Sequence, residues 1–282
     1  MTVINTNISA NIARDAINRN DRAMSTSMQR LSTGLRINSA KDDAAGMAIA
    51  NRMAGQISGL NMAKRNANDA ISMVQTIEGA SKEITSMLVR MRELAVQSAS
   101  GTYSQTDRDA LELEFDALQA EITRISTNTE WNEMALMSGG DTVTIQLGAS
   151  DSQSMDIVFK DWSQSAAAGA FGADISGLSI DGADVAASLV AADASIAALD
   201  GAITAATSEQ ATYGAYLSRL THASDNLGNV STNLDQSRSR IQDADYAAET
   251  TALARTQIIA QASTAMLAQA NLVKQTVLAL LQ

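Results

Sequence analysis

This chain of 282 residues is 45% hydrophobic but only 3% aromatic, and its apolar residues are mostly Ala, Leu, Ile and Met. Such small side chains suit thin helical rods better than a compact enzyme built around a pocket. The net charge of −11 disfavours nucleic-acid binding, and the absence of cysteine with a single histidine argues against disulfides, thiolate chemistry and a transition-metal site.

The N-terminal part of the chain predicts one helix followed by a polar connection. The first twenty residues are polar and amphipathic and lack the apolar run of a secretory signal. No stretch approaches the eighteen apolar residues of a membrane span. Residues 3–35 predict a first helix, with Gly34 weakening or bending its end. After the polar residues 38–46 the chain returns to helix, and Gly55 and Gly59 mark expected irregularities.

Residues 60–98 predict a long helix around which the other elements are organised. Its apolar or small residues recur at alternating steps of three and four, which is the pattern of a coiled-coil seam. One seam position holds Leu60, Ala67, Val74, Ser81, Leu88 and Ala95, and the other holds Ala63, Ala70, Ile77, Ile84, Met91 and Ser98. Further apolar residues, Ile71, Met73, Met87 and Leu94, flank this seam, so we expect the helix to bury more than one side.

Downstream the pattern predicts a third helix and then a β-hairpin. Thr106 and Asp109 form a variant capping box at the start of a helix of about twenty residues. Alternating apolar residues in 141–147 and 155–159, separated by a Gly- and Ser-rich turn, predict the hairpin. Trp131 and Trp162 are expected to cover its face, and residues 163–184 predict loop or weak structure.

A second heptad array predicts another long helix, of about fifty residues. Its two seam positions are expected to be Leu189, Ile196, Ile203, Gln210, Leu217, Ser224 and Ser231 in one row, with Ala192, Leu199, Ala206, Tyr213, Leu220, Leu227, Leu234 and Ile241 in the other. A C-terminal amphipathic helix follows from about Ala247.

These elements predict a mainly α fold. We expect a long antiparallel, coiled-coil-like helical bundle with a small β-hairpin at its tip and paired terminal helices. Two short helices in water are marginally stable, so their apolar faces should fold when many copies bury them together. The residues expected on these faces are Ile4, Ile8, Ile12, Ile259, Met266, Val273, Val277 and Leu280.

Motifs of catalysis are not found in the sequence. There is no HExxH pair, no glycine-rich phosphate loop and no GxSxG, and His222 is interpreted as a solvated or partly packed residue. The acidic cluster at residues 112–116 is interpreted as a solvated helix face. The chain is therefore expected to be no enzyme and to hold no metal or cofactor.

Several long motifs closely resemble those of bacterial flagellin. They are RLSTGLRINSAKDDAAG (30–46), RNANDAISMVQTIEGA (65–80), RMRELAVQSASG (90–101), SRIQDADYA (239–247) and AMLAQAN (265–271). The resemblance implies a structural subunit that polymerises into the extracellular flagellar filament used for swimming. It implies terminal inner-core helices at 1–40 and 245–282, and an outer-core rod bundle at 41–244. The latter includes the hairpin 141–162 and a short variable segment 163–188, since the large central domains of many flagellins look absent.

The resemblance also implies partners. Export is expected through the flagellar type III apparatus without cleavage, with a chaperone on the C-terminal helix, and the hook-junction and cap proteins are further expected partners. By motif position, Arg90, Glu93, Leu94 and Glu114 correspond to a subunit-packing surface that Toll-like receptor 5 binds in some flagellins. Packing is expected to be their primary role.

Three alternatives remain open. The hook–filament junction protein has similar ends, but the dense match from Arg65 to Gly101 favours flagellin. A secreted translocator or adhesin that inserts helices into membranes would favour basic polar faces, which the acidic balance does not supply. A flagellin with a central protease domain would need zinc-binding histidines, which this chain lacks.

Overall fold

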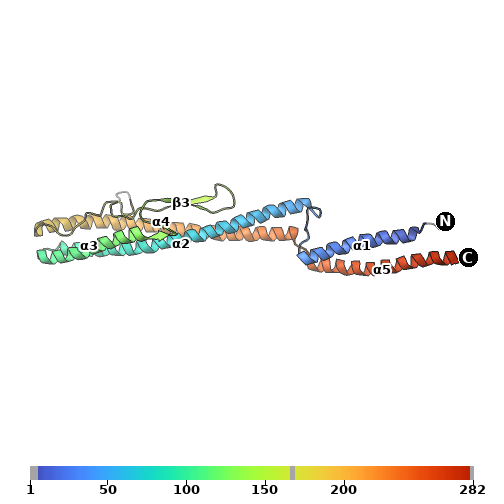
Figure 1. Cartoon of the computed structure of the whole chain (residues 1–282). Coiled ribbons are helices and arrows are strands. Elements are labelled where there is room, and N and C mark those ends of the chain that lie inside the picture. The colour runs from blue at the N-terminus through green and yellow to red at the C-terminus, as the bar shows by residue number, and fades with distance from the viewer. Residues whose placement is uncertain (1–5, 166–168, 280–282) are drawn as a thin grey trace. The chain divides into compact units, whose positions relative to one another are not determined.

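The chain is mainly α-helical, as the sequence predicts. A computed structural model describes residues 6–165 and 169–279, with side chains up to residue 272. The helices in these ranges are α1 (Ile8–Thr33), α2 (Ala44–Ser98), α3 (Gln105–Asn128), α4 (Val185–Gln242) and α5 (Tyr246–Ala279) (Figure 1). The strands are β1 (Glu130–Trp131), β2 (Met134–Ala135), β3 (Thr142–Gln146) and β4 (Ser154–Val158), which form two antiparallel pairs, β1–β2 and β3–β4.

The chain divides into two compact units. Unit 1 comprises residues 1–57 and 232–282, and unit 2 comprises residues 58–231. The boundaries fall inside α2 and α4, not at the non-helical residues near 40 and 245 where the inner-core and outer-core division is expected. The expected inner-core and outer-core division follows the breaks between helices, whereas the two compact units follow contacts between residues. The inner-core and outer-core division therefore stays a prediction.

In unit 1, α1 and α5 run side by side (Figure 1). Gly34 does not bend the first helix but ends it, since it adopts a left-handed conformation (φ 72°) and donates its backbone N–H to the carbonyl of Arg30. The connection after α1 is held by a backbone bridge between Leu35 and Asp243. The pairing of the terminal helices is therefore confirmed for the described residues.

The long helix α2 begins earlier than the sequence indicates. It runs without interruption from Ala44, so the irregularities expected at Gly55 and Gly59 are wrong. Gly59 has a different role, because a Cβ there would lie 2.9 Å from the Cβ of Ala149, and glycine lets the hairpin turn approach the helix. All twelve predicted seam positions from Leu60 to Ser98 are buried. Met73 and Leu94 are buried beside them, which confirms that this helix buries more than one side.

The third helix begins two residues before the predicted start. Ser104, not Thr106, is the N-cap, and its side chain and that of Asp107 form the reciprocal capping box. One turn later, Arg108 is fully buried and donates to Ser98 Oγ (3.3 Å) and to the carbonyl of Ser100 (2.8 Å). The guanidinium thus lies at the C-terminal end of α2, where the helix dipole favours a positive charge.

The buried stripe of α4 differs from the predicted seam in its first half. The row of Ala192, Leu199, Ala206, Tyr213, Leu220 and Leu227 is buried as expected. The other row is only partly confirmed there, because Ile196 and Ile203 pack against the core but are partly buried, whereas Ser188, Ser195 and Ala202 are fully buried. The reason lies in the segment before α4, which packs on this face: Ser195 Oγ donates to the carbonyl of Ser179 at 2.7 Å.

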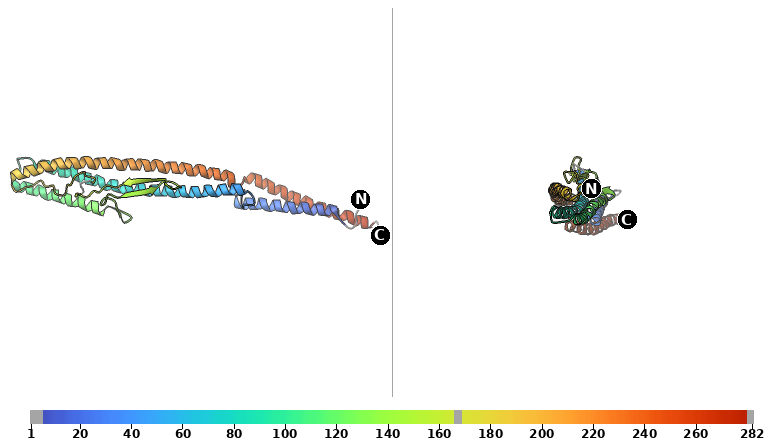
Figure 2. Two further views of the ribbon diagram at one scale, coloured as in Figure 1. Left: turned by 90° about the horizontal axis from the view of Figure 1, so that it is seen from above. Right: turned by 90° about the vertical axis from the view of Figure 1, so that its left-hand side faces the viewer.

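The predicted β-hairpin is present but is not at the tip of the bundle. In β3–β4, Thr142 pairs with Val158 and Gln146 with Ser154. Asn66 of α2 donates to the carbonyl of Gln146 (3.2 Å), so the hairpin lies against the side of α2, as the two side-on views agree (Figures 1 and 2). The hairpin buries Met155 and Ile157 on the helices, which a position at the end of the bundle would not allow.

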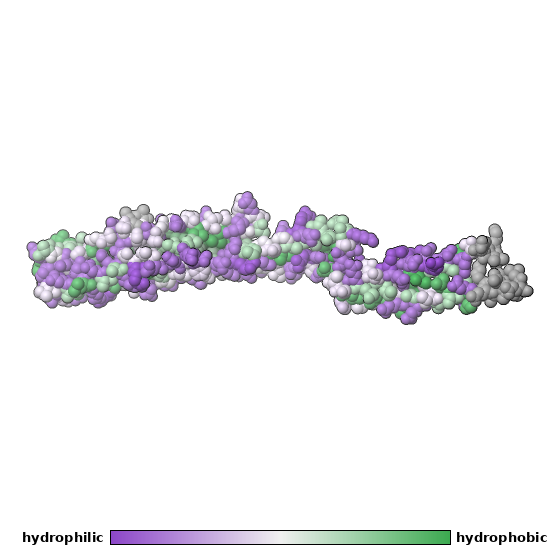
Figure 3. Space-filling view, in the orientation of Figure 1, coloured by the Kyte–Doolittle hydropathy of each residue, from purple (hydrophilic) through white to green (hydrophobic). Residues whose placement is uncertain are grey.

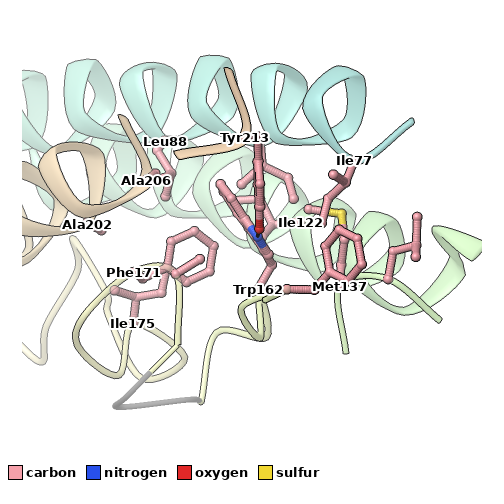
Figure 4. Close-up of a cluster of buried hydrophobic side chains, with 14 of the residues drawn as sticks. Ile77, Leu88, Ile122, Met137, Trp162, Phe171, Ile175, Ala202, Ala206 and Tyr213 are labelled. Carbon is pink, nitrogen blue, oxygen red and sulfur yellow. Dashed lines mark hydrogen bonds between the residues drawn. The ribbon is translucent and has the colours of Figure 1, made fainter. Parts of the chain in front are cut away.

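Residues 159–184 form no helix or strand in the part that the structure describes, as expected, but they are closely packed. Trp162 is fully buried and donates its indole N–H to the hydroxyl of Tyr213 at 3.1 Å (Figure 4). Its ring meets Phe171 edge to face at a centroid distance of 5.6 Å. Trp162 therefore belongs to the core, while Trp131 is only partly buried and lies beside β3.

Among the described residues, α4 contains one window of eighteen residues that is long and apolar enough to cross a membrane by composition alone, with a mean hydropathy of 1.5. The expectation that no stretch reaches this level is therefore wrong. Alanine is frequent in the first half of α4, which raises the mean without forming a run of large apolar residues. The core helix of a soluble bundle passes the same test, so the window is weak evidence for a membrane.

Candidate polymerisation surfaces

The contact between α1 and α5 uses small and polar side chains. On α1 the buried residues are Ala10, Asn20 and Ser27. Asn20 Nδ2 donates to the carbonyl of Thr256 at 2.8 Å, and Arg30 pairs with Glu249 at 2.9 Å. The pair also partly buries Ile17, Met24, Leu31 and Leu253, but it leaves other large apolar side chains of both helices uncovered.

Large apolar side chains of both helices point to solvent. Ile8 is 59% exposed, Ile12 62%, Ile259 43% and Met266 67%. Ile258, next to the predicted Ile259, is 66% exposed and was not predicted, although an adjacent isoleucine pair in an amphipathic helix is itself a signal. Of the other predicted face residues, Ile4 and Leu280 lie outside the described residues, and the side chains of Val273 and Val277 do as well.

Two of these side chains line an apolar groove between α1 and α5. The groove has a volume of about 420 Å³, and its lining includes Ile12, Ala16, Ala262 and Met266. Ligand-binding clefts typically have volumes of about 300–1,000 Å³. Figure 3 shows hydrophobic surface over the same helix pair. Monomeric soluble proteins rarely leave such apolar surface uncovered, and where they do it marks an interaction site.

A second surface lies on α2 and α3 in unit 2. Arg90 Nε donates to Glu114 at 2.8 Å and its Nη1 donates to Glu93 at 3.0 Å. These hydrogen bonds, that to Glu114 first, raise the pKa of Arg90 above its usual value. All three side chains are about half exposed, so the cluster is a solvated ion-pair network that contributes little to the stability of the unit. Its charges are available to a partner.

Leu94, which was expected to share this surface, does not reach it. Its side chain is 1% exposed and belongs to the core of unit 2, so it can affect the surface only through packing. The exposed aliphatic residues nearby are Val89 (43%) and Val96 (48%), which lie seven apart on one helix face, and Leu113 (74%) next to Glu114. An apolar residue recurring outside the seam is the signal that could have identified this valine pair.

The first half of α4 adds an apolar surface of small side chains. Val190 is 71% exposed and Val185 40%. In the most apolar eighteen-residue window of this helix, only 28% of the window is buried. Small exposed side chains allow helices of neighbouring molecules to approach closely, and the heptad pattern of α4 does not indicate this surface.

Comparison with known proteins identifies the family. The family model of the bacterial flagellin N-terminal helical region matches residues 4–142, and that of the C-terminal helical region matches residues 196–281. The chain belongs to the bacterial flagellin family. It is 42% identical to a flagellin of Halalkalibacterium halodurans over 281 residues, covering 99% of this chain and all of the relative. This match over the full length of a short relative confirms the short type.

Two further comparisons are consistent with this assignment. The chain is 35% identical to flagellin B of Vibrio cholerae over 371 aligned positions, covering 99% of both chains. A flagellar hook-associated protein from Vibrio parahaemolyticus shares the fold alone, with 14% identity, a TM-score of 0.58, and coverage of 72% of this chain and all of that one. As a flagellin, the chain is a structural subunit of the flagellar filament, not an enzyme, and that filament is extracellular.

Proposed function

We propose that polymerisation is driven by burial of the exposed apolar residues of α1 and α5 among copies of the chain. The observation that supports this is the exposure of Ile8, Ile12 and Met266 on a helix pair whose fully buried residues on α1 are small or polar. In this proposal the segments 1–40 and 245–282 form the inner core of the filament. The rest, 41–244, forms the outer core, with 163–188 as its short variable segment.

Burial of these side chains would stabilise the assembly. Fully burying one large aliphatic side chain contributes about 1.5–3 kcal/mol relative to leaving it exposed. Four such residues, each between 43% and 67% exposed, would contribute several kcal/mol per subunit on assembly. A subunit in a filament contacts several neighbours, so this contribution is gained by every copy.

The Arg90–Glu93–Glu114 cluster is proposed to pack against a neighbouring subunit as its primary role. Its half-exposed charges and the adjacent Val89 and Val96 offer both ion pairing and apolar contact. We also propose that Toll-like receptor 5 contacts the same cluster. Leu94 would then support the surface from below, since it is buried.

The same exposed surface supports the remaining proposed partners. A subunit with an uncovered apolar face needs protection before assembly, which an export chaperone on α5 would provide. Secretion is proposed through the flagellar type III apparatus. The hook-junction and cap proteins would contact the two ends of the growing polymer, and membrane insertion and nucleic-acid binding are not part of this proposal.

Electron microscopy of the purified chain under polymerising conditions tests the proposal. The full chain should form long tubes of uniform width, and a chain lacking residues 1–40 and 245–282 should not. Hydrogen exchange provides an independent measurement, because α1 and α5 should be weakly protected in the monomer and strongly protected in the tube. Long tubes from the shortened chain, or strong protection of both helices in the monomer, would contradict it.

A further inference from the structure

The β3–β4 hairpin has an unpaired edge on β3. Leu147 donates to the carbonyl of Gln153 and Phe159 donates to that of Asp141, so the odd-numbered residues of β3 exchange hydrogen bonds with β4. In an antiparallel pair the alternate residues then direct their N–H and C=O groups to the other side. These are Thr142, Thr144 and Gln146. Among the described residues, no third strand joins this sheet.

A side chain of α2 already uses one of these outward groups. Asn66 Nδ2 donates to the carbonyl of Gln146 at 3.2 Å, which independently places the outer edge of β3 on the side of α2. This contact occupies only the last residue of the strand. The backbone groups of Thr142 and Thr144 remain for another partner, and all three residues of this edge are exposed.

A groove of about 350 Å³ runs along this edge. Its walls are residues 143–146 of β3, one face of α2 and the turn between β1 and β2. The apolar part of the lining includes Met73, Trp131 and Ile145, and the charged part is Asp69. No basic residue is among the lining residues that the structure describes, so the groove favours a neutral or basic occupant.

The strand itself lacks three of the features that normally prevent edge pairing, namely lysine, proline and a β-bulge. Exposed edges are usually blunted by lysine, proline or a β-bulge. β3 has the sequence TVTIQ, which is uncharged, begins with four β-branched residues in a row and pairs with β4 without a bulge. By contrast, β4 carries the charged Asp156 among its outward residues.

We propose that the outer edge of β3 is a docking site for an extended peptide, which adds to the hairpin as a third strand. Backbone hydrogen bonds to Thr142 and Thr144 would align the peptide, as in β-strand addition generally. Alternate apolar side chains of the peptide would enter the groove beside Trp131, and a basic side chain would lie near Asp69. A free strand edge recognises backbone, which is why the occupant is a peptide and not a small molecule.

Tryptophan fluorescence of the full-length monomer tests the proposal. The chain has two tryptophans, and because Trp162 is fully buried, a change on titration reports on Trp131 in the groove. The probe is an acetylated and amidated peptide with the sequence KTVTIQK, which is β3 flanked by lysines. The control is the same peptide with every strand amide N-methylated, which keeps its charge and side chains but cannot pair. Saturable binding of the first peptide alone is expected.

Two proline variants separate the edges of the hairpin. Thr144→Pro removes an outward N–H of β3 without removing a backbone hydrogen bond to β4, although it also removes the side-chain hydrogen bond from Thr144 Oγ1 to Asp156 (2.6 Å), and should weaken binding by about tenfold or more. Ser154→Pro makes the equivalent change on the outer edge of β4 and should leave binding unchanged. Circular dichroism of both variants checks that the chain is folded. If Thr144→Pro does not fold, the comparison of the two peptides on the parent chain still tests the proposal.

Three outcomes would overturn the proposal. The first is equal binding, or no binding, of the two peptides. The second is loss of binding in Ser154→Pro but not in Thr144→Pro. The third is a concentration-dependent dimer of the chain without peptide, seen by sedimentation and abolished by Thr144→Pro, since the edge would then be occupied by a second copy.

Discussion

Ile12→Ala is the sharpest test of the terminal helices as the polymerisation element. Each buried methylene contributes about 0.8 kcal/mol, and the substitution removes three. Since the side chain is 62% exposed in one molecule, about that share of its surface is newly buried on assembly. The subunit therefore loses about 1.5 kcal/mol of association free energy, which corresponds to a critical concentration roughly tenfold higher.

The critical concentration is measured by sedimenting filaments at a series of total concentrations and determining the protein left in solution. Val158→Ala is the matched control, because Val158 is an exposed aliphatic residue (38%) on the hairpin in unit 2. Its critical concentration should stay near that of the parent chain. An unchanged value for Ile12→Ala, with folding confirmed by circular dichroism, would refute burial of this face as the driving force.

Three further predictions concern unit 2. Arg108→Ala should lower the free energy of unfolding of unit 2 by about 2–4 kcal/mol in thermal unfolding, because it leaves a cavity and removes two hydrogen bonds. Arg108→Met should lower it by less, because methionine keeps most of the volume and removes a buried charge. Burial raises the pKa of the Glu209 carboxyl above its usual 4.5, so its contribution to stability is present below pH 4.5 and is lost as the pH rises. The melting temperature of Glu209→Gln should therefore exceed that of the parent chain by more at pH 7 than at pH 4. A difference in melting temperature that does not change with pH would contradict this. Arg90→Glu should leave thermal unfolding nearly unchanged, because the ion pairs are exposed, but should raise the critical concentration; normal assembly would remove this cluster from the packing surface.

Local patterns in the sequence were sufficient for the helices and the hairpin. The heptad spacing from Leu60 to Ser98 predicted all twelve buried seam positions, because a helix that packs on neighbours along its length must bury one stripe. Alternation of apolar residues predicted β3 and β4 for the same kind of reason. The sequence also predicted exposed apolar faces on the terminal helices, and Ile8, Ile12, Ile259 and Met266 are exposed, while the role of these faces in polymerisation stays a prediction.

Features that depend on packing between distant segments were decided only by the tertiary structure. The stripe on α4 shifts to Ser188 and Ser195 because the preceding segment packs on that face. Leu94 leaves the surface because α2 is covered on more than one side, and the hairpin lies beside α2 because Gly59 admits its turn. Periodicity tells which residues share a face of one element, but which neighbour covers that face depends on the whole fold.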